Sequence, residues 1–451
     1  MDHLQNVLSY FDQQQPLCAE HDRIPKDLYR EFGVKAGLRD ETGKGVLAGL
    51  TNISDIRAFQ YVDGVKHPAD GQLLYRGYDV KDLIRGSSGS RFAFEEAGYL
   101  LLFGQLPTPE QLEQFCAVLG ECRTMPTNFT RDVIMKAPSH DIMNSMARSV
   151  LTLASYDPKA ADLDTANVLR QSIQLAGIFP MLAVYSYHAY NHYEKDASMY
   201  IHRPDPSLST AENFLRMLRP DMQYTPLEAR VLDVALLLHA EHGGGNNSTF
   251  TTRVVTSSGT DTYSAMAAAL CSLKGPRHGG ANLMVMQMMQ NIRENLHDTE
   301  DDEELEAYLK KLLHGEAFDR KGLIYGMGHA VYTISDPREV ILKQRARHLA
   351  YDKGFEEEYN MLCSIERLAP GIFAEEKGST KPVCANVDLF SGLIYNMLGI
   401  SEDLYTPLFA IARVPGWCAH RVEEVIFANR IIRPAYKYLG VRQKYKPIEE
   451  R

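Results

Sequence analysis

Residues 275–282 read GPRHGGAN, a single histidine, His278, surrounded by glycine, proline, alanine and asparagine. Glycine and proline interrupt helices, so this stretch separates two regular elements. Taken alone it predicts only a solvated turn. The flanking segments indicate that His278 lies between two helices. The other breaks between predicted helices also contain polar residues.

The surrounding sequence has helical spacing of apolar residues. Segment 225–242 begins with Thr225, Pro226 and Glu228, the signature of a capping box with proline at the first helical position. Segments 261–276, 281–295, 335–350 and 388–399 are also predicted helices, and Asp336 with Glu339 predicts a second capping box. Only residues 45–80 have strand character, with a predicted turn at "DG" in RAFQYVDGVKHPADGQLLYRGY. The fold is therefore expected to be mainly α with a small β element near the N-terminus.

Polar residues recur at the breaks between these helices. The segments concerned are HAEHGGGNN with His239 and His242, GMGHAVYTISDPR with His329 and Arg338, NVDLFSG with Asp388, ARVPGW with Arg413, and IIRPAY with Arg433. Each is weak evidence by itself. The H-x-x-H pair is compatible with a metal site or with a helix C-terminus that favours histidine, and Asp388 is compatible with a plain helix cap.

Together these segments resemble the citrate synthase family. The resemblance extends over about nine-tenths of the chain, from residue 37 onward, and includes GLRDETGKGVLAGLTNISDI, LLYRGYDVKDL, FEEAGYLLLFGQLPT, HAEHGGGNNSTF, GPRHGGAN, GHAVYTISDPR, NVDLFSGLIYNMLGI, ARVPGWCAHRVEE and RIIRPAY. The resemblance implies an acyltransferase that condenses oxaloacetate with acetyl-CoA and hydrolyses the thioester to citrate and CoA.

The resemblance also implies roles for individual residues. Asp388 would be the general base, His278 the donor to the enolate oxygen, and His329 the donor to the oxaloacetate carbonyl. The matching substrate-binding residues are His242, Arg338, Arg413 and Arg433, the last acting across the interface of a homodimer. Guanidinium groups suit the two carboxylates of oxaloacetate because they form paired hydrogen bonds.

The family architecture implies a two-domain helical fold. A large domain would comprise residues 1–279 and 400–451, with a small domain inserted at 280–399. No metal or organic cofactor is implied, since the CoA thioester is a substrate.

Composition restricts the remaining possibilities. The formal net charge of −10 argues against nucleic acid as a partner, because phosphate binding favours basic surfaces. The seven cysteines are scattered without a C-x-x-C pair, as expected in a reducing compartment. The N-terminus lacks the features of a signal or transit peptide, and no apolar run reaches membrane-spanning length, so the expected location is the cytoplasm.

The sequence departs from many family members where they read GHRVYK, since Ala330 and Thr333 replace two basic residues that help to bind CoA phosphates. Lys274, Arg277 and Lys321 are the nearby candidates for that contact. The alternatives are a 2-methylcitrate synthase that uses propionyl-CoA and a catalytically inactive, CoA-binding helical protein.

Two electrostatic expectations follow for the catalytic groups. The helix that begins near Ala281 should lower the pKa of His278 and keep its imidazole neutral. For Asp388, a helix N-terminus lowers the pKa of the carboxylate whereas desolvation raises it, and desolvation on closure of the site is expected to prevail.

Overall fold

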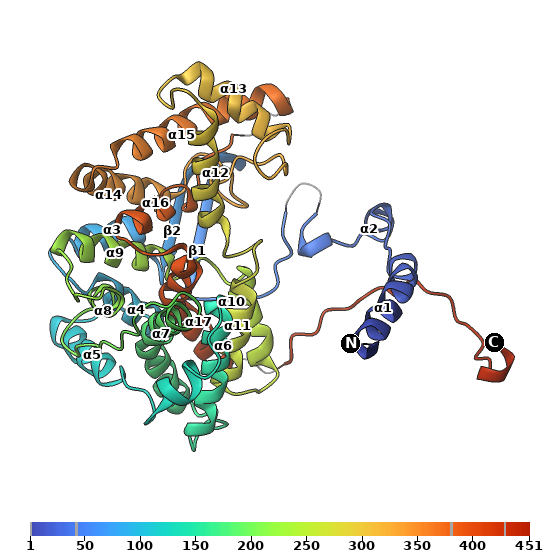
Figure 1. Ribbon diagram of the computed structural model, residues 1–451, viewed down its shortest axis with the longest axis horizontal. Helices are drawn as coiled ribbons and strands as arrows, with labels where there is room; N and C mark the ends of the chain where they lie inside the picture. The colour runs from blue at the N-terminus through green and yellow to red at the C-terminus, as the bar shows by residue number, and fades with distance from the viewer. Residues whose placement is uncertain (1, 41–43, 379–381, 428–429) are drawn as a thin grey trace. The chain divides into compact units, whose positions relative to one another are not determined.

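The computed structural model describes residues 2–40, 44–378, 382–427 and 430–451. The chain divides into two compact units, Met1–Leu50 and Thr51–Arg451. The first unit contains helices α1 (Asp2–His21) and α2 (Asp27–Glu31) and a short 3-10 helix, η1 (Ala36–Leu38). The second unit contains the sheet, the remaining helices and all predicted site residues (Figure 1).

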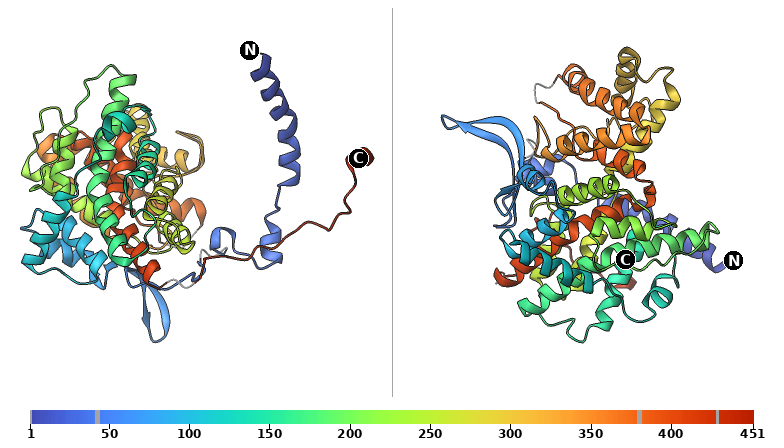
Figure 2. Two further views of the ribbon diagram at one scale, coloured as in Figure 1. Left: turned by 90° about the horizontal axis from the view of Figure 1, so that it is seen from below. Right: turned by 90° about the vertical axis from the view of Figure 1, so that its left-hand side faces the viewer.

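The sheet has three antiparallel strands in the order β1-β2-β3: β1 (Ser54–Val62), β2 (Val65–Tyr75) and β3 (Tyr78–Asp79). Val62 pairs with Val65 across a two-residue turn, in which Asp63 and Gly64 have φ angles of 51° and 76°. This left-handed backbone matches the twist of a hairpin and favours Asp-Gly. The predicted turn and β element are confirmed, and the hairpin projects from the helices (Figure 2).

Helices make up most of the second unit, which confirms the mainly α fold. They are α3 (Val80–Gly86), α4 (Ala93–Phe103), α5 (Pro109–Glu121), α6 (Ile142–Leu153), α7 (Thr165–Glu194), α8 (Thr210–Leu218), α9 (Pro226–His239), α10 (Asn247–Ser257), α11 (Thr262–Leu273), α12 (Ala281–Asn295), α13 (Asp302–Leu313), α14 (Pro337–Lys353), α15 (Glu356–Lys377), α16 (Asp388–Met397) and α17 (Tyr405–Phe427), with the short segments η2 (Thr130–Ile134), η3 (Ala154–Tyr156), η4 (Glu402–Leu404) and η5 (Ile448–Glu450). None of the described helices is long and apolar enough to cross a membrane.

Helix caps decide where several of these elements begin. The capping box of Thr225 and Glu228 at the start of α9 is present as predicted. The second predicted capping box, Asp336 with Glu339, is wrong. Asp336 accepts a hydrogen bond from the backbone N–H of Arg338, while Glu339 is buried and does not reach back to the cap. The Asp336 carboxylate binds the Arg338 side chain as well, so it serves the site in addition to the helix.

Helix α17 runs through the middle of the helical core (Figure 1). It packs against α4, α7, α9, α10 and α11, and its central residues Arg413, Trp417 and Arg421 are fully buried. Helices α12 to α16 pack largely against one another, and α14 also contacts β2 and α9. The division into domains at residues 280 and 399 stays a prediction.

Candidate active site

His278 lies in the turn between α11 and α12, where its ring faces Ser248 of α10. Its Nε2 atom accepts a hydrogen bond from the Ser248 backbone N–H at 3.3 Å and lies 3.0 Å from Ser248 Oγ. A backbone N–H can only donate, so Nε2 carries no proton and a neutral imidazole must hold its proton on Nδ1. Burial lowers the pKa of His278 to about 4, and the nearby Arg413 contributes in the same direction. The pKa is thus lowered as expected, but by burial and Arg413; a contribution from helix α12 stays a prediction.

The glycines beside His278 allow a close approach to the end of α11. A Cβ atom on Gly279 would lie 2.3 Å from the carbonyl oxygen of Leu273, which leaves no room for a side chain. The Gly279 carbonyl also accepts a hydrogen bond of 3.0 Å from Thr406 Oγ1. The motif therefore fixes the backbone around His278 between α11 and the start of α17.

His329 and Asp388 are brought together by two short segments that pair as an isolated antiparallel bridge. Backbone hydrogen bonds of 2.7 and 2.9 Å join residues 326–328 to residues 384–386. Asn386 also accepts a 3.0 Å hydrogen bond from the Asp388 backbone N–H through Oδ1. The bridge therefore pairs the segments that carry the two candidate catalytic residues, although these segments are far apart in the sequence.

The proton of His329 can be placed in the same way as that of His278. The backbone N–H groups of Val331 and Tyr332 both donate to His329 Nδ1 at 3.0 Å, so a neutral ring carries its proton on Nε2. The ring stacks on Tyr332 with centroids 4.6 Å apart and meets the His242 ring edge-on at 5.2 Å. His329 can therefore donate a hydrogen bond away from the loop that holds it.

His242 is the second imidazole of this group, located just beyond the end of α9. It is buried, and burial followed by the charge of Arg338 lowers its pKa well below the ordinary range. Its Nε2 atom has no hydrogen-bond partner within the described parts of the chain. A neutral, unsatisfied imidazole nitrogen at this place is suited to a polar ligand.

Two buried arginines supply positive charge to the cluster. Arg338 forms a paired contact with the Asp336 carboxylate, at 3.0 Å from Nε and 2.7 Å from Nη2. Arg413 donates from Nε to the carbonyl oxygen of His239 at 2.6 Å, while its Nη1 has no partner among the described residues. The unsatisfied donor of Arg413 is suited to a carboxylate of a bound substrate.

Asp388 begins α16 and faces these positive groups. Desolvation raises the pKa of its carboxyl group to about 6, although Arg338 and Arg413 act in the opposite direction. Desolvation thus outweighs the favourable charges in this structure, and a further rise of the pKa on closure of the site stays a prediction. A carboxylate with this pKa is a better proton acceptor than an exposed aspartate and is still ionised near neutral pH.

Arg433 is not brought to this cluster within one chain. It is exposed in the segment that follows α17, and it forms no hydrogen bond or ion pair with the other six predicted site residues in the described parts of the structure.

The three candidates for binding the CoA phosphates differ in their surroundings. Lys274 pairs with Asp141 and Lys321 with Asp319, whereas Arg277 is exposed directly before His278.

The H-x-x-H pair does not form the core of a metal site in the described residues, which contain no group of three or more potential ligands around one point. His239 ends α9 and is 2.7 Å from the carbonyl oxygen of Ala235 through Nδ1, a contact typical of a structural histidine. This supports the helix-terminus interpretation of His239.

Sequence reasoning missed several residues that shape the site. Ser248 and Tyr332 position the imidazoles of His278 and His329, and Asn386 holds the start of α16. For Asp336, the sequence pattern predicts only a cap. Pro337 and Arg338 are the local signals for its second role, the binding of the Arg338 side chain. The contacts of Ser248, Tyr332 and Asn386 depend on tertiary packing.

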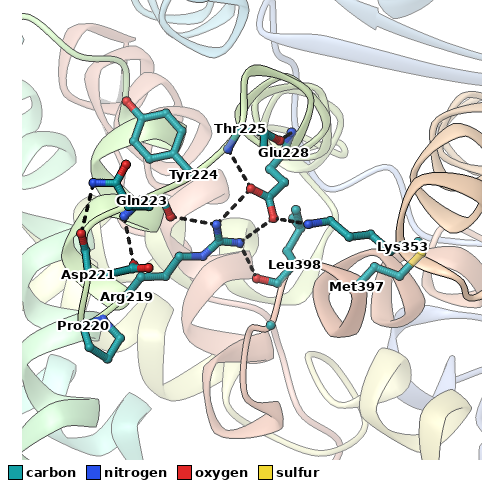
Figure 3. A pocket seen from close by; sticks show the side chains of 11 residues that line it. Arg219, Pro220, Asp221, Gln223, Tyr224, Thr225, Glu228, Lys353, Met397 and Leu398 are labelled. Atoms are coloured by element: carbon teal, nitrogen blue, oxygen red, sulfur yellow. Dashed lines mark hydrogen bonds and ion pairs between the residues drawn. The ribbon is translucent and has the colours of Figure 1, made fainter.

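A hollow on the second unit is lined by none of the residues of this cluster. It has a volume of about 820 Å³ and is lined by the segment before α9 and the ends of α14 and α16 (Figure 3). Its two cations, Arg219 and Lys353, both bind Glu228 at 2.9 Å. The charges of both cations are therefore paired within the hollow.

Comparison with known proteins agrees with this geometry. The family model for the citrate synthase C-terminal domain matches residues 38–435. A citrate synthase from Synechocystis is 36% identical over 90% of this chain and 92% of its own length. A 2-methylcitrate synthase from Shewanella oneidensis is 34% identical over 84% of this chain and 92% of its own length.

Solved structures lead to the same family. A citrate synthase from Pyrobaculum aerophilum covers 91% of this chain and 95% of its own, with 29% identity and a TM-score of 0.73. The ternary complex of a Thermoplasma acidophilum citrate synthase with carboxymethyl coenzyme A and oxaloacetate covers 90% of this chain and 97% of its own, with 29% identity and a TM-score of 0.74. With the sequence match over most of its length and the same arrangement of helices, the chain belongs to the citrate synthase family.

Proposed function

We propose that this protein is a citrate synthase that condenses oxaloacetate with acetyl-CoA and water to give citrate and CoA. Asp388 removes a proton from the acetyl methyl group while His278 hydrogen-bonds the developing enolate oxygen through Nδ1–H. The enolate carbon then attacks the carbonyl carbon of oxaloacetate, whose oxygen receives a proton from His329 Nε2–H. Water finally cleaves the citryl thioester and releases CoA.

The observation that carries this proposal is the placement of protons around the cluster. Both imidazoles have one nitrogen occupied by backbone donors, so each must present an N–H from its other nitrogen. Asp388 has a raised pKa and remains a base near neutral pH. Two neutral donors and one carboxylate are the groups needed to deprotonate a weak carbon acid and stabilise the resulting oxyanion.

Oxaloacetate would be bound through its two carboxylates by Arg338 and Arg413, with His242 contacting it as well. The unsatisfied atoms His242 Nε2 and Arg413 Nη1 support this assignment, since each is a buried group that a ligand oxygen or hydroxyl can satisfy. This acid–base chemistry requires no metal or organic cofactor from the protein.

The functional unit in this proposal is a homodimer in the cytoplasm, with Arg433 completing the site of the partner subunit. Exposure of Arg433 outside its own cluster supports a role in trans. All seven cysteines are free thiols, in agreement with a reducing compartment. For the CoA phosphates we favour Arg277, because Lys274 and Lys321 are each engaged by an aspartate.

The test is thiol release from acetyl-CoA and from propionyl-CoA in the presence of oxaloacetate. We expect a higher kcat/KM for acetyl-CoA, with loss of activity in His278→Ala and Asp388→Ala. A preference for propionyl-CoA would make the protein a 2-methylcitrate synthase, which the similarity to the Shewanella relative favours as the second candidate. The two acyl groups differ by one methylene, which binding pockets discriminate weakly. No thiol release from either substrate by folded protein would indicate an inactive CoA-binding protein.

A further inference from the structure

Helix α17 contacts the last residue of α9 and the residues that follow it. Arg413, Gly416 and His420 lie three and four positions apart, hence on one face of the helix. Arg413 Nε donates to the carbonyl oxygen of His239, and His420 Nε2 lies 3.0 Å from Oε1 of Glu241. Between them, a Cβ atom on Gly416 would lie 2.6 Å from Glu241 Oε2, so the glycine makes room for the carboxylate.

Glu241 is fully buried, directly before the substrate-binding candidate His242. Its Oε1 accepts hydrogen bonds from Ser54 Oγ and from His420, both at 3.0 Å. Its Oε2 has no hydrogen-bond partner in the described residues. Burial opposes ionisation, but the hydrogen bond from His420, the charge of Arg413 and the hydrogen bond from Ser54 lower the pKa of Glu241, so the group is a carboxylate at working pH.

The hydrogen bonds around His420 decide which group balances this buried negative charge. Arg253 Nε donates to His420 Nδ1 at 3.0 Å. A guanidinium cannot accept a hydrogen bond, so Nδ1 carries no proton and His420 is a neutral ring that donates to Glu241 from Nε2. Arg253 is itself paired with Glu423 and Glu424. The positive charge that still acts on Glu241 is that of Arg413, which lies one turn from Gly416 on the same face of α17.

We propose that Glu241 is the counter-charge of Arg413 and thereby sets the affinity of the site for the dianion oxaloacetate. Each candidate substrate-binding arginine then has its own buried carboxylate, Asp336 for Arg338 and Glu241 for Arg413. Such pairing avoids an isolated charge in the empty site, which would be strongly unfavourable. The two carboxylates also reduce the attraction between the site and its anionic ligands. The citrate trianion is therefore bound less tightly and can dissociate.

This proposal rests on oxaloacetate being the substrate, and Glu241→Gln tests it. Glutamine keeps the oxygen that accepts from Ser54 and His420 and removes only the charge. The dissociation constant of oxaloacetate, measured by calorimetry, should fall about tenfold because a nearby negative charge is lost. The inhibition constant of citrate should fall in parallel and kcat should decrease, whereas KM for acetyl-CoA should not change.

Two further variants serve as matched controls. Glu241→Asp keeps the charge and should restore a wild-type dissociation constant for oxaloacetate. Glu423→Gln removes a carboxylate that binds Arg253, the residue that donates to His420. Because Glu424 still balances the charge of Arg253, oxaloacetate binding should not change. Unchanged or weaker oxaloacetate binding in a folded Glu241→Gln protein would overturn the proposal.

A double-mutant cycle tests the pairing without any substrate. Urea unfolding of Glu241→Gln, Arg413→Met and the double variant should show that both single changes destabilise the protein and that the double variant loses less than their sum. If Glu241→Gln does not fold, the double variant should, because no unpaired buried charge remains. Additive losses of unfolding free energy, or a double variant that does not fold, would refute the pairing. This result does not depend on the proposed activity, because no substrate is used.

Discussion

In the proposed reaction Asp388 must be ionised to accept a proton, yet burial favours the protonated acid. Desolvation raises the pKa of its carboxyl group to about 6. We therefore expect kcat/KM for the acyl-CoA to fall about tenfold per pH unit below pH 6, as the base becomes protonated in the free enzyme. The profile should be recorded between pH 4.5 and 8.5, with circular dichroism at each pH to exclude unfolding. A rate that stays constant down to pH 5 would contradict this role of Asp388.

The same residue should lower the stability of the fold. Because the folded pKa of about 6 exceeds the unfolded value near 4, the folded state binds the proton more tightly and loses stability as pH rises through this interval. The full effect corresponds to at most about 3 kcal/mol. Asp388→Asn should thus increase the free energy of unfolding at pH 8 and have little effect at pH 4, as measured in urea. A decrease at pH 8 would show that the charged form of Asp388 stabilises the fold.

At the scale of elements, the contact between β2 and the loop before α14 supports the site from behind. A Cβ atom on Gly71 would lie 2.3 Å from the carbonyl oxygen of Ser335 and 2.6 Å from the ring of Tyr332. Gly71→Ala should displace the Tyr332 ring that stacks on His329, raise KM for oxaloacetate about tenfold and cost about 2 kcal/mol of stability. Steady-state kinetics and urea unfolding measure these effects. Gly86→Ala at the end of α3, where a Cβ meets open space, should change neither, and equal losses in both variants would refute the specific contact.

The same elements show what could be predicted from the sequence. The cap of α9 and the Asp63-Gly64 turn are predicted correctly because they depend on residues at most three positions apart. The cap of α14 was only half right, since a local pattern cannot tell whether Glu339 turns back or becomes buried. The bridge between residues 326–328 and 384–386 has no local signal at all, and only the family resemblance placed His329 near Asp388.

At the scale of the whole molecule, the resemblance predicted the family and the mainly α fold. Six of the seven predicted site residues lie in the segments that form one cluster. The tautomers of His278 and His329 and the counter-charge at Glu241 could not be predicted, because they follow from hydrogen bonds between distant helices. Arg433 is different, since a single chain leaves it exposed. Its role depends on the assembly.

That role predicts complementation between two inactive variants. If Arg433 acts across a homodimer, Asp388→Ala and Arg433→Ala should each be inactive, whereas a mixed dimer contains one site with both residues intact. Random pairing after joint unfolding and refolding makes half of the dimers mixed, so about a quarter of all sites, and of wild-type activity, should return. Each variant refolded alone is the control. If Arg433 acted within its own chain, both sites of a mixed dimer would lack one residue, and no activity would return.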